Sequence, residues 1–389
     1  MLAPLEGFVV GITADRRADE QADLLTRRGA RVVHGPMIRT HSMVTDDALR
    51  HATEEVIAHP PDYVVANTGI GVRGWLTAAA TWGWDDDLTS ALAGSRVVAR
   101  GAKAAGAMAS IGVDVWWRAP SESLREVLAR LLEEPLDGAT VAFQLHGADS
   151  PEFAAALREA GARLVEVPVY RWEKPDAPEA ARALVAKVCS GDVDAVTFTS
   201  APAIAHCFEI AAADGHEAAL RSALNERVVV AVVGPYCAEA ARIHGLDDLV
   251  EPVAARMGSM VRALTERLHA SQRTVRDGRR LVTVQGRAVS VRDVDAPVVA
   301  TNDGDDDGCG CGEVVWLPTR ERWLLDRLVQ RPGVVVSRAH LCRAVWGAPV
   351  DEHALDVTMA RLRRSLGAAG VVIETLPKRG YRIVGTAGI

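Results

Sequence analysis

The sequence predicts an α/β protein in which a parallel α/β unit occurs twice, followed by a smaller C-terminal module of helices and a hairpin. Three observations predict this fold class. Short β-branched runs alternate with helical stretches over roughly the first 270 residues, and this pattern repeats at an offset of 132 residues. Near the C-terminus, an apolar stripe at helical spacing precedes two short β-branched runs.

The repeat is visible in aligned segments. Residues 29–33 align with residues 161–165, and residues 62–68 align without a gap with residues 194–200. Further pairs in the same register are Leu25 with Leu157, Pro36 with Pro168 and Arg39 with Arg171. So many matches in one register indicate duplication of a single unit.

Within the first copy, strands are predicted at residues 8–13, 31–33, 63–66 and 97–99, and helices at residues 21–28 and from Val72 onward. The strands read as continuous apolar runs, which is typical of parallel strands buried on both faces. Alternation with helices predicts a two-domain, duplicated parallel α/β architecture with helices on both faces of each sheet.

In such sheets, ligands bind beyond the carboxyl ends of the strands. Glycine, hydroxyl residues and helix N-termini are expected there, and they suit a small anionic ligand. The candidate ligand-binding residues are Thr68, Gly69, Gly101, Lys103, His146, Gly147, Thr199, Ser200, Gly234 and Tyr236. For any single loop, an ordinary strand-to-helix turn is the alternative, but the number of such loops favours a binding site.

The C-terminal module contains a basic helix. Asp351 can cap a helix over residues 352–366, and Gly367 can end it. One apolar stripe runs along this helix, through Leu355, Met359, Leu362 and Leu366. Its arginines lie off the stripe or on its flank, and the alternative for a lone helix is an ordinary solvated charged face.

The neighbouring segments favour DNA binding. Thr319 can cap a helix over residues 320–330, and Ser337 can cap a short helix over residues 338–346. Residues 371–373 and 381–384 read as strands around a turn at residues 377–380, which completes a winged helix-turn-helix. The predicted contacts to double-stranded DNA are Ser337, Arg338, Trp346, Val357, Thr358, Arg361, Arg363, Arg364, Lys378, Arg379 and Arg382.

Several motifs of this module resemble the DNA-binding domain of OmpR-type response regulators. They are residues 317–325, 337–341, 345–347, 355–366 and 378–383. The resemblance implies a small N-terminal sheet, for which residues 281–284, 288–291 and 298–299 read as strands. We expect a linker at residues 269–280, a DNA-binding domain at residues 281–389, and tandem or dimeric half-sites on DNA.

The duplicated half resembles uroporphyrinogen-III synthase over about residues 5–268. The resemblance is carried by residues 29–33 with Pro36, and by residues 167–171, 197–201 and 232–235. It implies one α/β domain at residues 1–39 and 172–268, a second at residues 40–171, and a tetrapyrrole bound between them. Tyr170 stands where the family has its usual catalytic tyrosine.

The sequence also departs from that family. Tyr236 and Cys237 follow Gly234–Pro235 where the family favours small hydroxyl residues, and Ala102 and Lys103 replace a hydroxyl residue in the first copy. We therefore expect a transcriptional regulator whose duplicated half senses a small molecule. A working uroporphyrinogen-III synthase with an appended DNA-binding domain is one alternative, and a scaffold that only mediates dimers is another. The combined architecture resembles actinobacterial regulators of nitrate and nitrite assimilation.

The charge distribution agrees with a single DNA-binding end. Residues 313–389 carry 12 Lys and Arg against 7 Asp and Glu, whereas residues 1–312 carry 32 against 44. No apolar run is long enough to predict a membrane span, and the N-terminus does not resemble a secretion signal, so a cytoplasmic protein is expected.

Residues 301–312 form an acidic, glycine-rich insertion containing Cys309 and Cys311. The alternate aspartates lack the later glutamate of a calcium loop, and the two cysteines lack a second pair for zinc. We expect a solvated loop, no bound metal and no cofactor; redox or metal sensing by the two cysteines is the alternative. The other four cysteines, Cys189, Cys207, Cys237 and Cys342, are predicted to be packing thiols.

Overall fold

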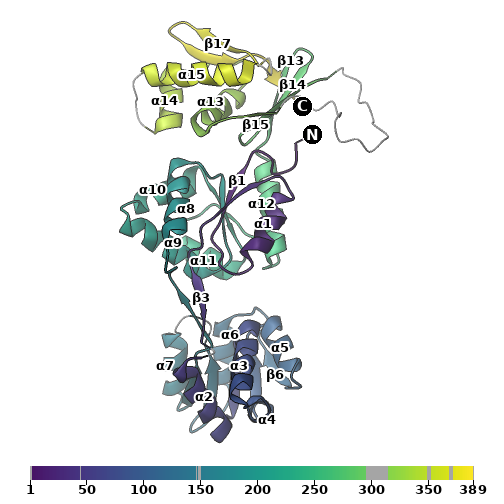
Figure 1. Cartoon of the computed structure of the whole chain (residues 1–389), viewed down its shortest axis with the longest axis vertical. Helices are drawn as coiled ribbons and strands as arrows, with labels where there is room; N and C mark the ends of the chain where they lie inside the picture. Colours follow the sequence, from purple (N-terminus) through teal and green to yellow (C-terminus); the bar gives the residue numbers. More distant parts are fainter. Residues whose placement is uncertain are drawn as a thin grey trace, which may run out of the picture. The chain divides into compact units, whose positions relative to one another are not determined.

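A computed structural model describes residues 2–43, 45–145, 147, 150–294, 314–347, 352–367 and 371–388 (Figure 1). The chain divides into two compact units, of which the first contains Met1–Ile38 and Pro175–Ile389 and the second contains Arg39–Lys174. The insertion at residues 301–312, the helix cap predicted at Asp351 and the strand predicted at residues 298–299 lie outside the described residues.

The first unit begins with a five-stranded parallel sheet in the order β12-β11-β10-β1-β2. Its strands are β1 (Val9–Ile12), β2 (Arg31–His34), β10 (Ala195–Phe198), β11 (Val229–Val232) and β12 (Leu249–Val250). Its helices are α1 (Ala18–Thr26), α8 (Glu179–Ser190), α9 (Ala201–Ala213), α10 (Glu217–Glu226), α11 (Pro235–Ile243) and α12 (Met257–His269). Helices α1 and α12 pack together on one face, and α8–α11 pack on the other (Figure 1).

The second unit repeats this sheet in the order β6-β5-β4-β7-β8. Its strands are β4 (Tyr63–Ala66), β5 (Arg96–Ala99), β6 (Val115–Arg118), β7 (Thr140–Gln144) and β8 (Arg163–Val167). Its helices are α2 (Asp47–Ala58), α3 (Gly69–Trp82), α4 (Asp85–Ala93), α5 (Ala102–Ala109), α6 (Leu124–Leu132) and α7 (Pro151–Glu159). Strand for strand, β4 corresponds to β10 and β7 to β1, so the predicted duplication and α/β fold class are confirmed.

Separate cores lie on the two faces of the second sheet. The α2–α5 face buries Trp75 and Leu49, while the α6–α7 face buries Phe143 and Leu131. Strand β4 is buried along its whole length, as expected for a parallel strand covered on both faces. A two-stranded antiparallel ribbon of β3 (Arg39–Ser42) and β9 (Tyr170–Glu173) also belongs to this unit.

The C-terminal module has an antiparallel sheet in the order β16-β15-β14-β13-β19, three helices and a hairpin. The sheet contains β13 (Arg273–Asp277), β14 (Arg280–Gln285), β15 (Ala288–Asp293), β16 (Val314–Trp316) and β19 (Thr386–Ala387). The remaining elements are α13 (Thr319–Val329), α14 (Arg338–Trp346), α15 (Glu352–Gly367), β17 (Ile373–Leu376) and β18 (Gly380–Ile383). The four stripe residues of α15 are at most 1% exposed, so the predicted inward face is confirmed.

Two local predictions for this module were wrong. Residues 273–277 were expected to be linker but form β13, because Val275 is fully buried in the module's core and the strand pairs with β14. Thr319 does not cap α13; its hydroxyl donates to Asp192 and accepts from Arg287 at 2.8 Å. By contrast, Ser337 caps α14 as predicted, accepting a hydrogen bond from the backbone N–H of His340 at 3.3 Å.

The module packs directly on the first α/β domain. The buried Gln285 side chain donates hydrogen bonds to the carbonyl oxygens of Ala3 and Glu6, both at 2.8 Å. At Gly7, which has a φ of +88°, a Cβ atom would lie 2.1 Å from the carbonyl oxygen of Gln285. Only glycine therefore allows the N-terminal loop to approach the β14–β15 turn so closely.

Candidate nucleic-acid interface and candidate ligand site

Helix α15 presents cations on the side opposite its buried stripe. Arg361 and Arg364 are exposed, and neither makes an ion pair within the described residues. A helix with an outward arginine row has the width and donors to enter a DNA major groove. Val357 is half-buried on the same helix.

Arg363 points toward the hairpin. Its guanidinium donates to the carbonyl oxygen of Ile373 at 2.8 and 3.1 Å and to the Thr375 hydroxyl at 2.7 Å. Thr358 is only 8% exposed, and its hydroxyl donates to the carbonyl oxygen of Ala354 at 2.8 Å. Both residues therefore make contacts inside the module.

A hydrogen-bonded network of three side chains connects α15 to the rest of the module. Asp356 accepts hydrogen bonds from the Tyr381 hydroxyl at 2.6 Å and from Arg338 at 2.7 Å, and Arg338 also donates to the Tyr381 hydroxyl at 2.8 Å. The Tyr381 and Arg338 hydrogen bonds hold the pKa of Asp356 below its ordinary value. The network ties α14, α15 and β18 together, and sequence reasoning missed the role of Asp356.

The hairpin turn is cationic. Lys378 adopts a φ of +62°, and it and Arg379 are exposed at the tip without ion pairs among the described residues. Arg382 is paired with Glu374 at 2.7 Å. Trp346 is partly buried against the module's core, at the end of α14. Arg361 and Arg364 on α15 and Lys378 and Arg379 at the hairpin tip are therefore exposed cations that make no ion pair among the described residues.

In the second unit, predicted ligand residues gather at the carboxyl end of β4. Buried Gln144 accepts hydrogen bonds from the backbone N–H groups of Asn67 at 3.1 Å and Thr68 at 3.0 Å. The Thr68 hydroxyl caps α3 through Gly71 and lies 3.3 Å from the hydroxyl of buried Tyr170. Gln144, which sequence reasoning did not select, thus positions the start of α3.

Asn67 has an amide without a partner. The residue is 2% exposed, and neither Oδ1 nor Nδ2 has a hydrogen-bond partner among the described residues. A buried polar group without a partner costs about 1–3 kcal/mol, so a polar molecule binding here would find an unsatisfied donor and acceptor.

The neighbouring strand end is filled by a carboxylate from the chain itself. Glu122 accepts a hydrogen bond from the Ala102 N–H at 3.3 Å, at the start of α5. A Cβ atom at Gly101 would lie 2.9 Å from the Glu122 carboxyl carbon. Lys103 packs through its backbone against Gly69. The helix N-terminus predicted for a ligand therefore already holds an anion.

The remaining predicted ligand residues occupy separate places. Gly147 packs against Tyr170 and Trp172 of β9, while His146 lies outside the described residues. In the first unit, the Ser200 hydroxyl precedes α9 and is buried without a partner among the described residues, and Thr199 beside it is half-buried. Gly234 is the N-cap residue before α11, and Tyr236 is 47% exposed on the first turn of that helix.

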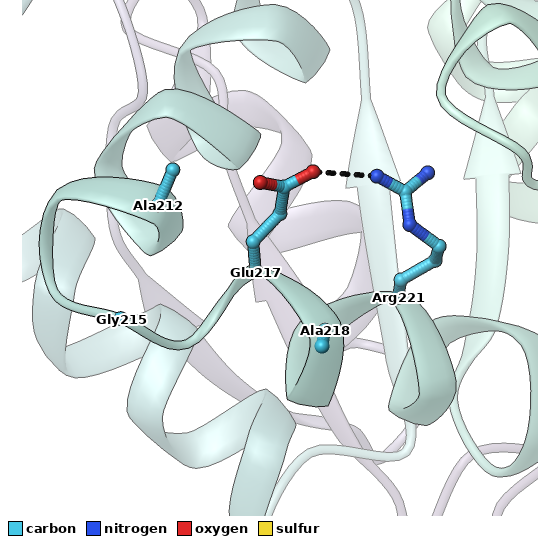
Figure 2. A pocket seen from close by; sticks show the side chains of 5 residues that line it. All are labelled: Ala212, Gly215, Glu217, Ala218 and Arg221. Carbon is cyan, nitrogen blue, oxygen red and sulfur yellow. Dashed lines mark hydrogen bonds and ion pairs between the residues drawn. The ribbon is translucent and has the colours of Figure 1, made fainter.

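An open hollow of about 430 Å³ lies between the end of α9 and the start of α10, and Figure 2 shows the residues that line it. Among the described residues, the charged ones that line it are Glu217 and Arg221, which pair with each other at 2.6 Å. It lies at the C-terminal end of α9, whereas Ser200 marks the N-terminal end. It is therefore separate from the strand-end positions.

Cys207 and Cys237 are buried as predicted, and burial raises the pKa of each thiol to about 12. Cys342 is also buried, while Cys189 is half-buried. Cys309 and Cys311 lie outside the described residues, and within the part of the chain that the structure describes no group of His, Cys, Asp and Glu side chains is arranged to hold a metal ion. Among the described residues, no helix combines the length and apolar character needed to cross a membrane.

The fold and the exposed cations define a class: a duplicated α/β body joined to a winged-helix DNA-binding domain. Residues 19–262 match the family described as uroporphyrinogen-III synthase HemD, and residues 312–383 match transcriptional regulatory protein, C terminal. The chain belongs to the uroporphyrinogen-III synthase HemD family and carries an OmpR/PhoB-type DNA-binding domain at its C-terminal end. This combination of domains indicates a transcriptional regulator.

Individual relatives cover the two parts separately. A mutant uroporphyrinogen III synthase from the extremely thermophilic bacterium Thermus thermophilus is 29% identical, covers 67% of this chain and 99% of its own, and superposes with a TM-score of 0.54. The uncharacterized protein YjjA of Bacillus subtilis is 28% identical over 66% of this chain and 94% of its own length. PhoB of Rhizobium meliloti, a phosphate regulon transcriptional regulatory protein, is 41% identical over 18% of this chain and 33% of its own length.

Proposed function

We propose that this protein is a DNA-binding transcriptional regulator whose duplicated α/β half senses a small anionic ligand. The observation that carries the proposal is the outward face of α15, where Arg361 and Arg364 make no ion pair among the described residues. Lys378 and Arg379 extend this cationic surface at the hairpin tip. Because the proposed target is chromosomal DNA, we propose a cytoplasmic location.

The contacts within the module support different roles for the residues that are predicted to bind DNA. Arg361 and Arg364 would read bases in the major groove, with Val357 beside them, and Lys378 and Arg379 would contact the backbone. Residues already bonded within the module would hold these groups in place. They are Arg338, Thr358, Arg363 and Arg382, while Ser337 and Trp346 would orient α14 toward the phosphates.

DNA fragments selected from a random duplex library by the full chain would supply the binding site. Arg361→Ala is expected to weaken binding to that site by about 1–3 kcal/mol if Arg361 reads a base. Arg242→Ala, which removes an exposed arginine of α11, is the matched control and should leave affinity unchanged. Equal affinities of the wild type and Arg361→Ala would remove Arg361 from the interface, and failure to select any sequence would oppose sequence-specific regulation.

The unsatisfied amide of Asn67 beside Thr68 supports a ligand site in the α/β half. We propose a tetrapyrrole as the first candidate ligand, because of the family, and nitrate or nitrite as the second, because of the resemblance to nitrogen-assimilation regulators. Footprinting with and without hydroxymethylbilane, nitrate and nitrite should show one of them changing occupancy of the selected site. Thr68→Val should reduce that response, whereas Thr77→Val, an exposed threonine on α3, should not.

A catalytically active synthase is the second candidate function. It is favoured by the Tyr170 hydroxyl, which lies 3.3 Å from the Thr68 hydroxyl at a strand end. Incubation of the full chain with hydroxymethylbilane, followed by separation of the uroporphyrinogen isomers, tests this function. Formation of the type III isomer by the wild type and a loss of rate in Tyr170→Phe would establish it; only the type I isomer, as in the spontaneous reaction, would exclude it.

A further inference from the structure

A cationic cavity of about 310 Å³ lies where the C-terminal module meets the first α/β domain. The α/β domain contributes Arg227 and Arg267, and the segment that begins the module contributes Arg273, with Arg322 from α13. Among the described residues that line the cavity, Asp194 is the only acidic one. Four guanidinium groups against one carboxylate leave a formal charge of +3 on the described lining.

Asp194 and Arg322 are the two most buried charged residues that line this cavity. The Asp194 side chain is 2% exposed, accepts the Val9 N–H at 2.7 Å, and forms an ion pair with Arg322, which is 16% exposed. The duplication supplies a comparison, because Asp62 stands at the equivalent position and accepts the Thr140 N–H at 2.8 Å. The carboxylate thus has the same role in both sheets, and the pairing with Arg322 is added only where the module docks.

The other arginines of the cavity lining have N–H donors that a bound ligand could use. Arg227 lies at the end of α10 with its guanidinium 5.2 Å from the centre of the Trp323 ring. Arg273 donates to the carbonyl oxygens of Ala270 at 3.2 Å and Gln272 at 3.0 Å. Neither makes an ion pair among the described residues. Arg267 pairs with Asp248 at 2.6 Å, and that carboxylate is 70% exposed.

We propose that this cavity binds a small oxyanion carrying two or three negative charges, held between the α/β domain and the DNA-binding module. Guanidinium groups bind phosphate and carboxylate oxygens through paired hydrogen bonds, and an anion relieves the repulsion among clustered cations. The volume is at the lower end of ligand pockets, which suits a phosphate, a pyrophosphate or a small polycarboxylate and excludes a tetrapyrrole.

This site is distinct from the strand-end positions of the same sheet. Asp194 precedes β10, whereas Thr199 and Ser200 follow it, so the two places are separated by the length of a four-residue strand, about 13 Å. An anion in the cavity would connect Arg227 and Arg267 of the body to Arg273 and Arg322 of the module. Resting on the proposed function, this connection would strengthen docking of the DNA-binding module and thereby change its affinity for DNA.

Calorimetry on the full chain, without DNA, tests the site itself. Inorganic phosphate, pyrophosphate and citrate are titrated at constant ionic strength, with chloride and nitrate as monovalent comparisons. We expect saturable binding of at least one multivalent anion and about tenfold weaker binding in Arg227→Gln and in Arg273→Gln. Arg262→Gln, an exposed arginine on α12 outside the cavity lining, is the matched control and should bind like the wild type.

Thermal melts of each variant without anion show whether it remains folded. Binding that is unchanged in Arg227→Gln and Arg273→Gln, or weakened equally in Arg262→Gln, would overturn the proposal, as would the absence of saturable binding by all three multivalent anions. A second measurement, DNA affinity with and without the bound anion, addresses coupling alone. If the anion binds but DNA affinity does not change, the site stands and its regulatory role is refuted.

Discussion

Asp194→Asn is expected to destabilise the first unit by about 2–3 kcal/mol, because it removes one of the two carboxylates that pair with the largely buried Arg322 guanidinium, while Asp326 remains 3.4 Å away. Asp62→Asn is the internal control. Its carboxylate accepts one backbone N–H and makes no ion pair among the described residues, so the loss should be about 1 kcal/mol. An asparagine oxygen can keep accepting that N–H at either site, so the difference between the two variants isolates the ion pair.

Urea unfolding followed by circular dichroism measures the total loss, and hydrogen exchange read by mass spectrometry assigns it to one unit. Exchange should accelerate in α13 and β10 of Asp194→Asn and in β4 and β7 of Asp62→Asn. The double variant Asp194→Asn with Arg322→Met should lose less stability than the two single variants lose when their losses are added. The reason is that the double variant removes both charges of the ion pair together. Equal losses in Asp194→Asn and Asp62→Asn, or strict additivity in the double variant, would refute the reasoning.

Arg363→Ala should destabilise the C-terminal module by about 1–3 kcal/mol through the lost hydrogen bonds to Ile373 and Thr375, as measured by exchange in β17; an intact β17 with weakened DNA binding would instead make Arg363 a direct DNA contact. The folded-state pKa of Asp356 lies below its unfolded value, so its contribution to stability is present above about pH 4 and is lost as pH falls through the folded pKa. In Asp356→Asn, the free energy of unfolding should therefore fall less steeply as pH is lowered below about 4 than it does in the wild type. An unchanged dependence of the unfolding free energy on pH would contradict this. In native protein at pH 8, iodoacetamide should leave Cys207 and Cys237 unmodified because burial raises their pKa to about 12, and peptide mass spectrometry showing rapid labelling would disprove it.

The features that sequence reasoning identified are those with a period or a repeat. The stripe ending at Leu366 and the β-branched run at 63–66 follow the spacings of a helix and a buried strand, and both elements form as predicted. The offset of 132 residues likewise yields two sheets with the same strand order. Such patterns are local, or compare the chain with itself, and therefore need no knowledge of tertiary contacts.

No such pattern in the sequence identifies which side chains contact each other when they are far apart along the chain. Ser337 and Thr319 both stand at the start of a helix, yet Ser337 caps its helix while the Thr319 hydroxyl donates to Asp192, which is 127 residues away. Nothing in the linear pattern shows that Gln144 would reach the start of α3 or that Glu122 would fill the start of α5. Helix α15 was therefore predictable as an element, with Arg361 and Arg364 off its buried stripe, while the hydrogen bonds of Arg363 to Ile373 and Thr375 were not.

The order in which the strands of the first sheet pair has a consequence for synthesis on the ribosome. Strands β1 and β2 are made first, but β1 pairs with β10, across a separation of about 185 residues, only after the whole second unit has been made. The inner unit can thus fold before the outer one that encloses it in sequence, the reverse of the usual N-terminal-first order. Arg322 is made later still, and its partner Asp194 accepts a hydrogen bond from the N–H of Val9 in β1. Docking of the C-terminal module through this ion pair therefore indicates a nascent chain in which β1 has already joined the sheet.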